Sequence, residues 1–542
     1  MSFSPSQAGR SAQGGLEYKW KVLISVIFGI FMIILDSTVI NVALQTLRRE
    51  YDATLTSTQW IISIYVLALG IMTPLSGFLA DRFGIKRMYI GGLILFVIGS
   101  ILCGLAPTLT LLIAARVVQG IGGGIAQPLG PPQLYRAFPP EEQGTALGFF
   151  GVALVLAPAL GPILGGLLVD ANLWRWIFFI NVPIGITGVI LASRWLKRDD
   201  TTRKPRLDPL GMLLAVTAFG SLLFAATNAA DLGWTSGTVL TWFIIGGVAL
   251  IAFGVVELFV AREPLLDLRL FQRKQFAVAA LVGYVTVLAL FGAEFLMPVY
   301  LQALRGRTAL QTGLLLLPLA ISSGIVTPIA GRLYDKIGPR ILVIIGFSLL
   351  IINTWQFSKI EALTPISTLM WLLALRGVAL GLIVQTTFTT ALSAVPRNLL
   401  PRGSSLLNGT RFVVQSIGVA VLATILSSSV SQTTKDFQQR AQETVPAAGA
   451  TAFGLCETPG VPADQNIPAA ARQAPPAQQV QIKASINQAC HENLVGFENA
   501  YLFTFYFAIV ALGIGAFLPG WPFKWAGRTA AAAEQPAASG AH

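Results

Sequence analysis

Two acidic residues stand inside long apolar stretches of this sequence, where an ionised side chain is costly. Asp36 lies in FMIILDSTVIN and Glu294 lies in LFGAEFLMPVY. A carboxylate in hydrocarbon must titrate, pair with a cation or face water, so both residues are predicted to carry protons or to bind substrate. The alternatives are a hydrogen bond that only fixes helix packing for Asp36, and a cavity-lining acid that only tunes substrate charge for Glu294.

Three arginines also lie within apolar stretches. A guanidinium does not release its proton, so Arg116 cannot itself be a proton carrier. It can instead hold a carboxylate or a chain of water in place, and binding by backbone carbonyls is an equal alternative. Arg376 and Arg411 receive the same interpretation with more weight on structure, and Glu257 is expected in an interfacial or structural role.

The elements that must position these residues are apolar blocks of helical length. Of 542 residues, 54% are hydrophobic and 11% are charged, and the mean hydropathy is +0.69. A soluble domain is about 25% charged, and about 20 apolar residues cross a bilayer. The sequence therefore predicts an all-α polytopic membrane protein. Fourteen spans are predicted near 21–44, 59–80, 88–106, 109–134, 144–169, 175–193, 209–230, 238–260, 276–301, 309–330, 341–357, 366–395, 405–428 and 499–521.

Several other classes of protein do not fit the sequence. The formal charge of +12 comes from residues in short loops between spans, which is the pattern of membrane topology and not of a nucleic-acid-binding face. The segment GIGGGIAQP at 120–128 lacks the spacing of a phosphate-binding loop, and no Gly-x-x-x-x-Gly-Lys-Ser/Thr occurs. No enzymatic activity, cofactor or metal is predicted, and transport is expected to use an ion gradient.

The distribution of basic residues predicts the orientation. The amino terminus and every second loop hold 24 of the 37 Lys and Arg residues, so both termini are predicted to be cytoplasmic.

An internal repeat predicts two related halves. GFLADRFGIK at 77–86 recurs as GRLYDKIGPR at 331–340, eight spans later and on the same side. Paired repeats of this kind build many transporters around a midplane site. The predicted segments are a cytoplasmic tail at 1–20, a six-helix half at 21–200, a two-helix insertion at 201–262, a second half at 263–521 that includes an external loop at 429–498, and a tail at 522–542.

The repeated loop is predicted to gate the cytoplasmic face. A glycine permits the tight turn, and the charges can pair with a helix end of the opposite half in one conformation only. Retention of positive charge inside is the alternative, but acidic residues contribute little to topology. The predicted gating residues are Gly77, Asp81, Arg82, Gly84, Lys86 and Asp335.

The segment APALGPILGG at 157–166 combines helix-kinking prolines with small residues that let another backbone approach. It is predicted to form an interface that packs and re-opens, and generic helix packing is the alternative. Its residues are Pro158, Gly161, Pro162, Gly165 and Gly166.

Five segments together resemble the major facilitator superfamily, in its fourteen-spanner drug:proton antiporter branch. They are LDSTVINVAL at 35–44, GFLADRFGIK, IAARVVQGIGGG with Arg116, APALGPILGG and WRWIFFINVPIG at 174–185. The resemblance implies a major facilitator fold and a role for Arg116 in proton transfer. One position departs from the pattern, because Ile85 replaces a usual basic residue, and Lys86 or Arg87 is expected to make that contact.

The resemblance implies a proton-coupled antiporter that exports hydrophobic, cationic drugs or toxic compounds across the cytoplasmic membrane. Its expected partners are the small substrate, protons and the lipid bilayer, and the need for an accessory export protein stays open. The alternatives are an exporter of an endogenous lipid, siderophore or secondary metabolite, and a non-transporting membrane sensor.

Two cysteines in the external loop are predicted to form a disulfide. Cys456 and Cys490 share the oxidising side of the membrane, where such bonds persist. Cys103, alone in a span, is interpreted as a small apolar residue.

Overall fold

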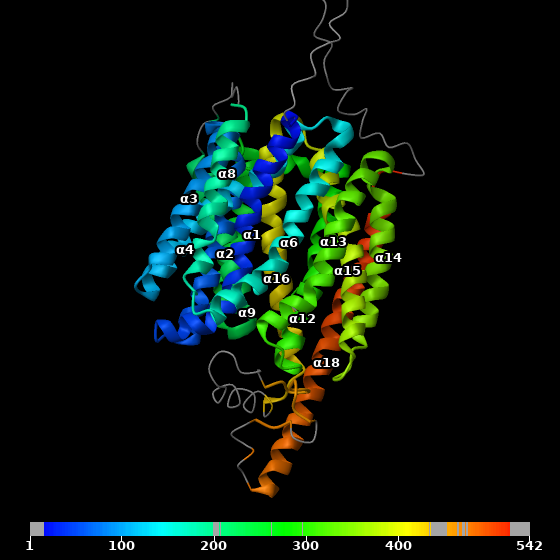
Figure 1. The fold of residues 1–542 in the computed structure, drawn as a ribbon. Helices are drawn as coiled ribbons and strands as arrows, with labels where there is room; N and C mark the ends of the chain where they lie inside the picture. The colour runs from blue at the N-terminus through cyan, green and yellow to red at the C-terminus, as the bar shows by residue number, and fades with distance from the viewer. Residues whose placement is uncertain are drawn as a thin grey trace, which may run out of the picture.

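The computed structural model consists of helices and connecting segments (Figure 1). It describes residues 16–198, 205, 208–261, 263–294, 296–432, 434, 453–462, 466–468, 472 and 475–520. Thirteen helices within these residues are long and apolar enough to cross a membrane. The position of the remaining predicted span is occupied by α11 (Lys274–Glu294) followed by α12 (Leu296–Val299). The all-α polytopic prediction is therefore confirmed.

The first half contains six spans in chain order. The span with Arg116 continues from an α-helix through a 3₁₀ turn into a second α-helix, and the sixth span is preceded by a short helix. The elements are α1 (Tyr18–Glu50), α2 (Leu55–Phe83), α3 (Ile85–Leu105), α4 (Leu109–Ala126), η1 (Gln127–Leu129), α5 (Gly130–Ala137), η2 (Pro140–Glu142), α6 (Gln143–Asp170), α7 (Trp176–Phe179) and α8 (Asn181–Trp195).

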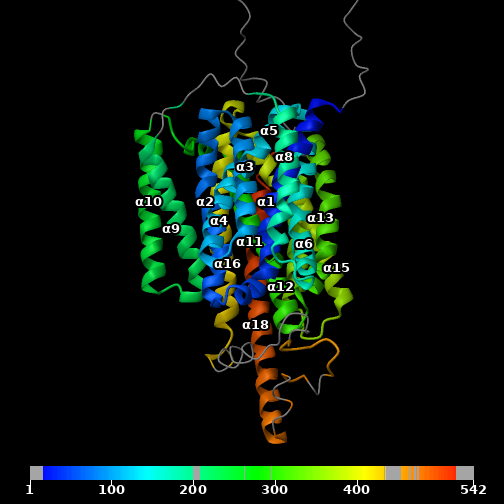
Figure 2. The same cartoon turned by 60° about the vertical axis from the view of Figure 1, so that its left-hand side comes forward.

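Two further helices stand at one side of the bundle, beside α2 (Figure 2). They are α9 (Pro209–Leu232) and α10 (Gly237–Val255), which ends in the π-turn η3 (Val256–Val260). Helix α9 packs between the two halves, because a Cβ on Gly70 of α2 would lie 2.4 Å from Leu223 and a Cβ on Gly409 would lie 3.5 Å from Phe219. The insertion thus covers one seam of the bundle.

The second half repeats the architecture of the first. Its first span passes from α11 and α12 into a π-turn, and its last helix is the longest element in the described residues. The remaining elements are η4 (Leu268–Gln272), η5 (Tyr300–Leu304), α13 (Ala309–Ile337), α14 (Pro339–Ser358), α15 (Ile366–Ser393), η6 (Arg397–Leu399), α16 (Leu400–Ser428) and α18 (Pro476–Gly515).

Local sequence explains where several helices begin. Thr54 and Thr108 accept backbone N–H bonds at the starts of α2 and α4, and Thr308 forms a capping box with Gln311 at the start of α13. The repeated glycines Gly84 and Gly338 adopt φ of 94° and 80°, a conformation that favours glycine. These two turns bring α2 into α3 and α13 into α14 at the same end of the bundle.

We call this end, which also holds Tyr18, the inner end, following the charge-based topology, and the opposite end the outer end. Helix α18 extends beyond the outer end (Figure 1). It begins at Pro476 and not near residue 499, so part of the segment predicted as an external loop is helical. The stretch from Ala477 to Val495 contains no Gly or Pro and is rich in Ala and Gln, which favour helix.

Candidate functional site

Asp36 lies in the middle of α1 and is 1% exposed. Its Oδ2 accepts a hydrogen bond from Nη1 of Arg116 at 2.6 Å. Its Oδ1 accepts from Nε2 of Gln119 at 2.9 Å and from Nδ2 of Asn181 at 2.8 Å. The carboxyl thus meets three N–H donors from α4 and α8, which is the environment of an ionised carboxylate. We define Asp36, Ser100, Arg116, Gln119 and Asn181 as the buried polar cluster.

Arg116 is 0% exposed and is held on several sides. Its Nε donates to the carbonyl of Ile61 at 3.1 Å, and its Nη1 also donates to Oε1 of Gln119 at 2.7 Å. The guanidinium carbon lies 4.0 Å from the ring centre of Tyr65. Its Nη2 has no hydrogen-bond partner within the described part of the chain. Arg116 therefore compensates the charge of Asp36 and keeps one donor available.

This arrangement can store or release one proton. Protonation of Asp36 would neutralise it and leave the Arg116 charge uncompensated in a buried site, which costs several kcal/mol unless the helices rearrange. Sequence reasoning identified Asp36 and Arg116 but not Gln119, Asn181 or Ser100. Their signal is an amide or hydroxyl in an otherwise apolar helix, as in RVVQG and FFINVP.

Arg376 occupies the equivalent span of the second half, on α15, and is also 0% exposed. Its Nη1 donates to Oγ1 of Thr354 at 3.1 Å and to Oδ1 of Asn353 at 3.4 Å. Its guanidinium carbon lies 5.7 Å from the ring centre of Phe357. These partners are neutral side chains.

Glu294 is the last residue of α11, and its side chain lies outside the described part of the structure. Arg411 lines a small cleft between α11, α15 and α16. Tyr284 and Thr387 line the same cleft, together with mainly apolar side chains.

The repeated loop of the first half contacts the second half at the inner end. Oδ2 of Asp81 accepts a hydrogen bond from Nε of Arg402, near the start of α16, at 2.5 Å. Gly77 packs closely there, since an added Cβ would lie 2.6 Å from the carbonyl oxygen of Pro401. Lys86 donates to the carbonyls of Ser193 and Leu196 at the end of α8, within its own half.

Nη1 of Arg82 donates to the carbonyl of Pro205 at 2.5 Å, on the segment that leads to α9. The basic residue that contacts Asp81 from the second half is Arg402, which sequence reasoning did not single out. Its only signal is a basic residue at the predicted start of a span, in LLPRGSS.

The second copy of the loop binds a helix start in the first half. Oδ1 of Asp335 accepts from the backbone N–H of Gly144 at 2.8 Å, and Oδ2 accepts from the N–H of Thr145 at 2.8 Å and from its hydroxyl at 2.7 Å. These groups begin α6, where the helix dipole favours an anion. The two loops thus contact α16 and α6 in a pseudosymmetric way.

Further hydrogen bonds between the halves gather at the inner end. Ser76 and Ser405 share a hydrogen bond of 2.8 Å, and the hydroxyl of Tyr135 donates to the carbonyl of Thr389 at 2.7 Å. Gly331 and Gly144 are packed so closely that a Cβ on Gly331 would lie 2.2 Å from the carbonyl oxygen of Gly144. The inner end is closed in this conformation.

The glycines and prolines of α6 let it pack against two helices. A Cβ on Gly161 would lie 2.1 Å from Oγ1 of Thr38 on α1, and a Cβ on Gly313 of α13 would lie 3.0 Å from Pro162. Gly165 faces Val39 and Val42 of α1, and Gly166 faces Leu310 of α13. Pro158 lies within the same helix. This segment forms part of the seam between the halves opposite the α2–α16 seam.

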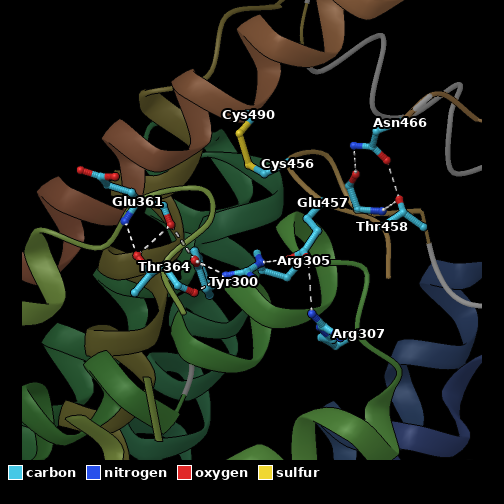
Figure 3. A network of polar contacts seen from close by, with 11 residues as sticks. Tyr300, Arg305, Arg307, Glu361, Thr364, Cys456, Glu457, Thr458, Asn466 and Cys490 are labelled. Atoms are coloured by element: carbon cyan, nitrogen blue, oxygen red, sulfur yellow. Dashed lines mark hydrogen bonds and ion pairs between the residues drawn. A yellow bond between two sulfur atoms is a disulfide. The ribbon is translucent and has the colours of Figure 1, made fainter. Parts of the chain in front are cut away.

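A separate network holds the outer end of the second half together (Figure 3). Cys456 and Cys490 form a disulfide, which joins the segment before α18 to α18 itself. Glu457 forms ion pairs with Arg305 and Arg307, and the N–H groups of Cys456 and Glu457 donate to the carbonyl of Leu304. Burial alone would lower the pKa of Arg305, but hydrogen bonds to Tyr300 and Glu457 outweigh it and raise that pKa.

Comparison with known proteins identifies the family of this chain. The sequence pattern of the Major Facilitator Superfamily matches residues 26–419. The chain belongs to this superfamily. The fold agrees, because the proton:xylose symporter XylE superposes with a TM-score of 0.54 over 93% of this chain and 96% of that one, at 13% identity. The human organic anion transporter MFSD10 superposes with a TM-score of 0.56 over 90% of this chain and 99% of that one, also at 13% identity.

The relatives of this chain include two proteins whose names refer to drugs. Lincomycin resistance protein LmrB of Bacillus subtilis is 31% identical over 77% of this chain and 88% of its own length. Multidrug export protein EmrB of Escherichia coli is 34% identical over 74% of this chain and 79% of its own length. The MFS-type transporter YhcA of Bacillus subtilis is 37% identical over 78% of this chain and 79% of its own length.

Proposed function

We propose that this major facilitator exports small hydrophobic drugs or toxic compounds from the cytoplasm in exchange for protons. The observation that carries the proposal is the buried ion pair of Asp36 and Arg116 in a chain whose relatives include named drug-resistance and drug-export proteins. The Asp36 carboxylate is 1% exposed within a span, so binding of a proton there would change the free energy of the conformation that encloses it. The sequence contains no phosphate-binding loop motif, so transport driven by ATP is not supported.

Proton exchange at Asp36 would alternate the protein between two conformations. In the conformation with the inner end closed, Asp36 is ionised and bound by Arg116, Gln119 and Asn181. A proton arriving from outside would discharge Asp36 and release the Arg116 charge to other partners. One proton moving inward down 100 mV provides about 2.3 kcal/mol, and each pH unit adds about 1.4 kcal/mol.

The two repeated loops would act as the gate of the cytoplasmic face. Asp81 with Arg402, and Asp335 with the start of α6, hold the inner end closed and would have to separate when the halves rock apart. Contacts made in only one of two conformations shift the balance between them, as a gate requires. With both termini cytoplasmic, this closed end faces the cytoplasm.

Selectivity for cations would depend on Glu294 more than on Asp36. The Asp36 carboxylate is enclosed by donors and does not face the cleft lined by Arg411. Glu294 is the last residue of α11, and residues of the same helix between 279 and 287 line that cleft. Glu294→Gln is therefore the variant that would relax the preference for cations while leaving export of neutral compounds.

Drug accumulation in a pump-deficient bacterial host tests the proposed function. Cells that express the protein should retain less of a fluorescent hydrophobic cation than cells with empty vector, and a protonophore should abolish the difference. Equal accumulation of every compound in a chemically diverse panel would contradict export of drugs. Export of an endogenous lipid or siderophore is the second candidate, and an extracellular metabolite that disappears on gene deletion would favour it.

A further inference from the structure

Two carboxylate oxygens lie buried at the inner end of the insertion with no hydrogen-bond partner among the described residues. They are Oε1 of Glu257, in the π-turn after α10, and Oδ2 of Asp208, just before α9. Glu257 is 2% exposed. A Cβ built on Gly211 would lie 2.4 Å from the Asp208 oxygen and 3.0 Å from the Glu257 oxygen. Both oxygens therefore lie beside the same point, within a few ångströms of each other.

The other oxygen of each carboxyl is already bound. Oδ1 of Asp208 accepts the N–H of Gly211 at 2.9 Å and so caps α9, and Oε2 of Glu257 accepts the N–H of Leu266 at 3.2 Å. Ionised carboxylate oxygens only accept hydrogen bonds, so two of them facing each other in a buried site are both unsatisfied and mutually repelling. One proton on Glu257 removes the repulsion and gives Oε1 an O–H donor, for which Oδ2 of Asp208 is the nearby acceptor once the side chains rotate into hydrogen-bond distance. Asp208 keeps its charge at the helix start, where the dipole favours it.

We propose that Asp208 and Glu257 bind one proton between them, and that release of this proton to the cytoplasm weakens the contact between Asp81 and Arg402. The inference rests on the proposed antiport function and adds a second proton site to it. Neither residue belongs to the buried polar cluster around Asp36.

Arg402 connects the acid pair to the gate. Its Nε binds Asp81, and its Nη1 donates to the carbonyl of Pro264 at 2.7 Å. Pro264 lies two residues before Leu266, whose N–H binds Glu257. Among the described residues, the charged side chains of Asp208 and Arg402 act on the Glu257 carboxyl. Arg402 therefore stands between two acidic groups that compete for it.

Other charged groups near the pair are occupied or point elsewhere. Arg269 donates to the carbonyl of Leu258 at 3.5 Å, Asp267 caps the following 3₁₀ turn, and Glu263 is exposed. Arg82 binds the carbonyl of Pro205, on the segment that leads to Asp208. Among the described residues, Arg402 is the charged group that contacts both Asp81 and the segment that binds Glu257.

The charge of the Asp208–Glu257 pair determines how strongly this pair competes with Asp81 for Arg402. With one proton bound, the pair carries one negative charge and Arg402 stays with Asp81. After the proton leaves, the pair carries two negative charges and attracts Arg402 away from Asp81. The inner end would thus open as the proton is delivered to the cytoplasm, which is the order that an exporter driven by inward proton flow requires.

A cysteine reporter at the gate tests this proposal in the full-length protein. Ser405 is 0% exposed and hydrogen-bonded to Ser76 across the closed seam, so in Ser405→Cys the maleimide labelling rate reports opening. Because thiolate formation alone speeds maleimide labelling as the pH rises, the rate is divided by that of the denatured protein carrying the same cysteine. We expect this ratio to rise with pH, by at most about tenfold per pH unit because one proton is involved. Glu257→Gln, which resembles the protonated acid, should give slow labelling at every pH. Asp208→Asn, which retains the helix cap, should also remove the pH dependence.

The matched control is Glu263→Gln, which removes an exposed carboxyl from the same segment and should leave the pH dependence intact. Infrared spectroscopy gives a second readout, since a protonated carboxyl band should be lost in Glu257→Gln and retained in the control. Unchanged pH dependence in Glu257→Gln would overturn the proposal, and so would a labelling rate that follows sodium concentration at constant pH. The assay uses no drug and no gradient, so its result is independent of whether export itself is proton-driven.

Discussion

Each half has a buried arginine at the equivalent position, but the two arginines have different hydrogen-bond partners. Arg116 on α4 and Arg376 on α15 are both 0% exposed. Arg116 binds the carboxylate of Asp36 at 2.6 Å, whereas Arg376 binds the neutral side chains of Thr354 and Asn353 at 3.1 and 3.4 Å. The first arginine therefore binds a side chain whose charge can change, whereas these two side chains at the second arginine are neutral.

This difference favours separate roles for two arginines that occupy corresponding spans of the two halves. A carboxyl group such as that of Asp36 can gain or lose a proton, whereas the side chains of Asn353 and Thr354 cannot change their charge in this way. We infer that the first half carries the proton-dependent change, while Arg376 supports packing in the second half. Substitutions of the two arginines should therefore have effects on stability that differ in cause and in magnitude.

The largest effect is expected for Arg116→Met. This change leaves the Asp36 carboxylate buried with only the amides of Gln119 and Asn181 as donors, and breaking a buried pair costs about 3–5 kcal/mol. Thermal unfolding of the purified protein in detergent measures it. Asp36→Asn combined with Arg116→Met should recover much of the loss, and an absence of recovery would show that the two charges do not act as a pair.

Arg376→Met should cost less, about 1–3 kcal/mol, because it leaves neutral groups unsatisfied and no buried charge. The same unfolding measurement, made in parallel, provides the comparison. If Arg376→Met destabilises the protein as much as Arg116→Met, the contrast between the halves is wrong.

The two copies of the gating loop should also differ. Asp81→Asn weakens a contact with the charged Arg402, while Asp335→Asn retains an oxygen that can accept the N–H groups of Gly144 and Thr145. We expect turnover to fall several-fold in Asp81→Asn and less in Asp335→Asn, with substrate binding retained in both. Drug transport and equilibrium binding in proteoliposomes separate these quantities, and identical turnover in both variants and the wild type would refute the gate.

The smallest effect on transport is expected for Cys456→Ser. The disulfide and the Glu457 ion pairs hold a segment of the second half at the outer end, away from the Asp36 cluster and the gating loops. Limited proteolysis should therefore cleave the segment around residues 453–462 faster, while drug export stays near the wild-type level. A loss of export comparable to that of Asp81→Asn would move the outer network into the transport mechanism.

The sequence predicted the elements of the fold better than the contacts between them. Hydropathy and the repeated loop predict the spans and the two halves, because both depend on local composition and spacing. The pairing of Asp81 with Arg402 depends on how α2 crosses α16, which no local pattern specifies. The same holds for Asn181 at Asp36, and for the helical part of 476–498, where a polar composition suggested a loop but helix-favouring residues prevail.

Drug-driven proton release by Asp36→Asn tests the central claim most directly. The wild-type protein in proteoliposomes loaded with a pH-sensitive dye should release protons when a substrate is added, because drug and proton compete for opposite conformations. The amide introduced by this substitution preserves the size of the side chain but cannot exchange a proton, so the account predicts substrate binding with less proton release than in the wild type, the remainder coming from Asp208 and Glu257. Proton release equal to that of the wild type would remove Asp36 from the coupling mechanism and would contradict the distinction between the two halves.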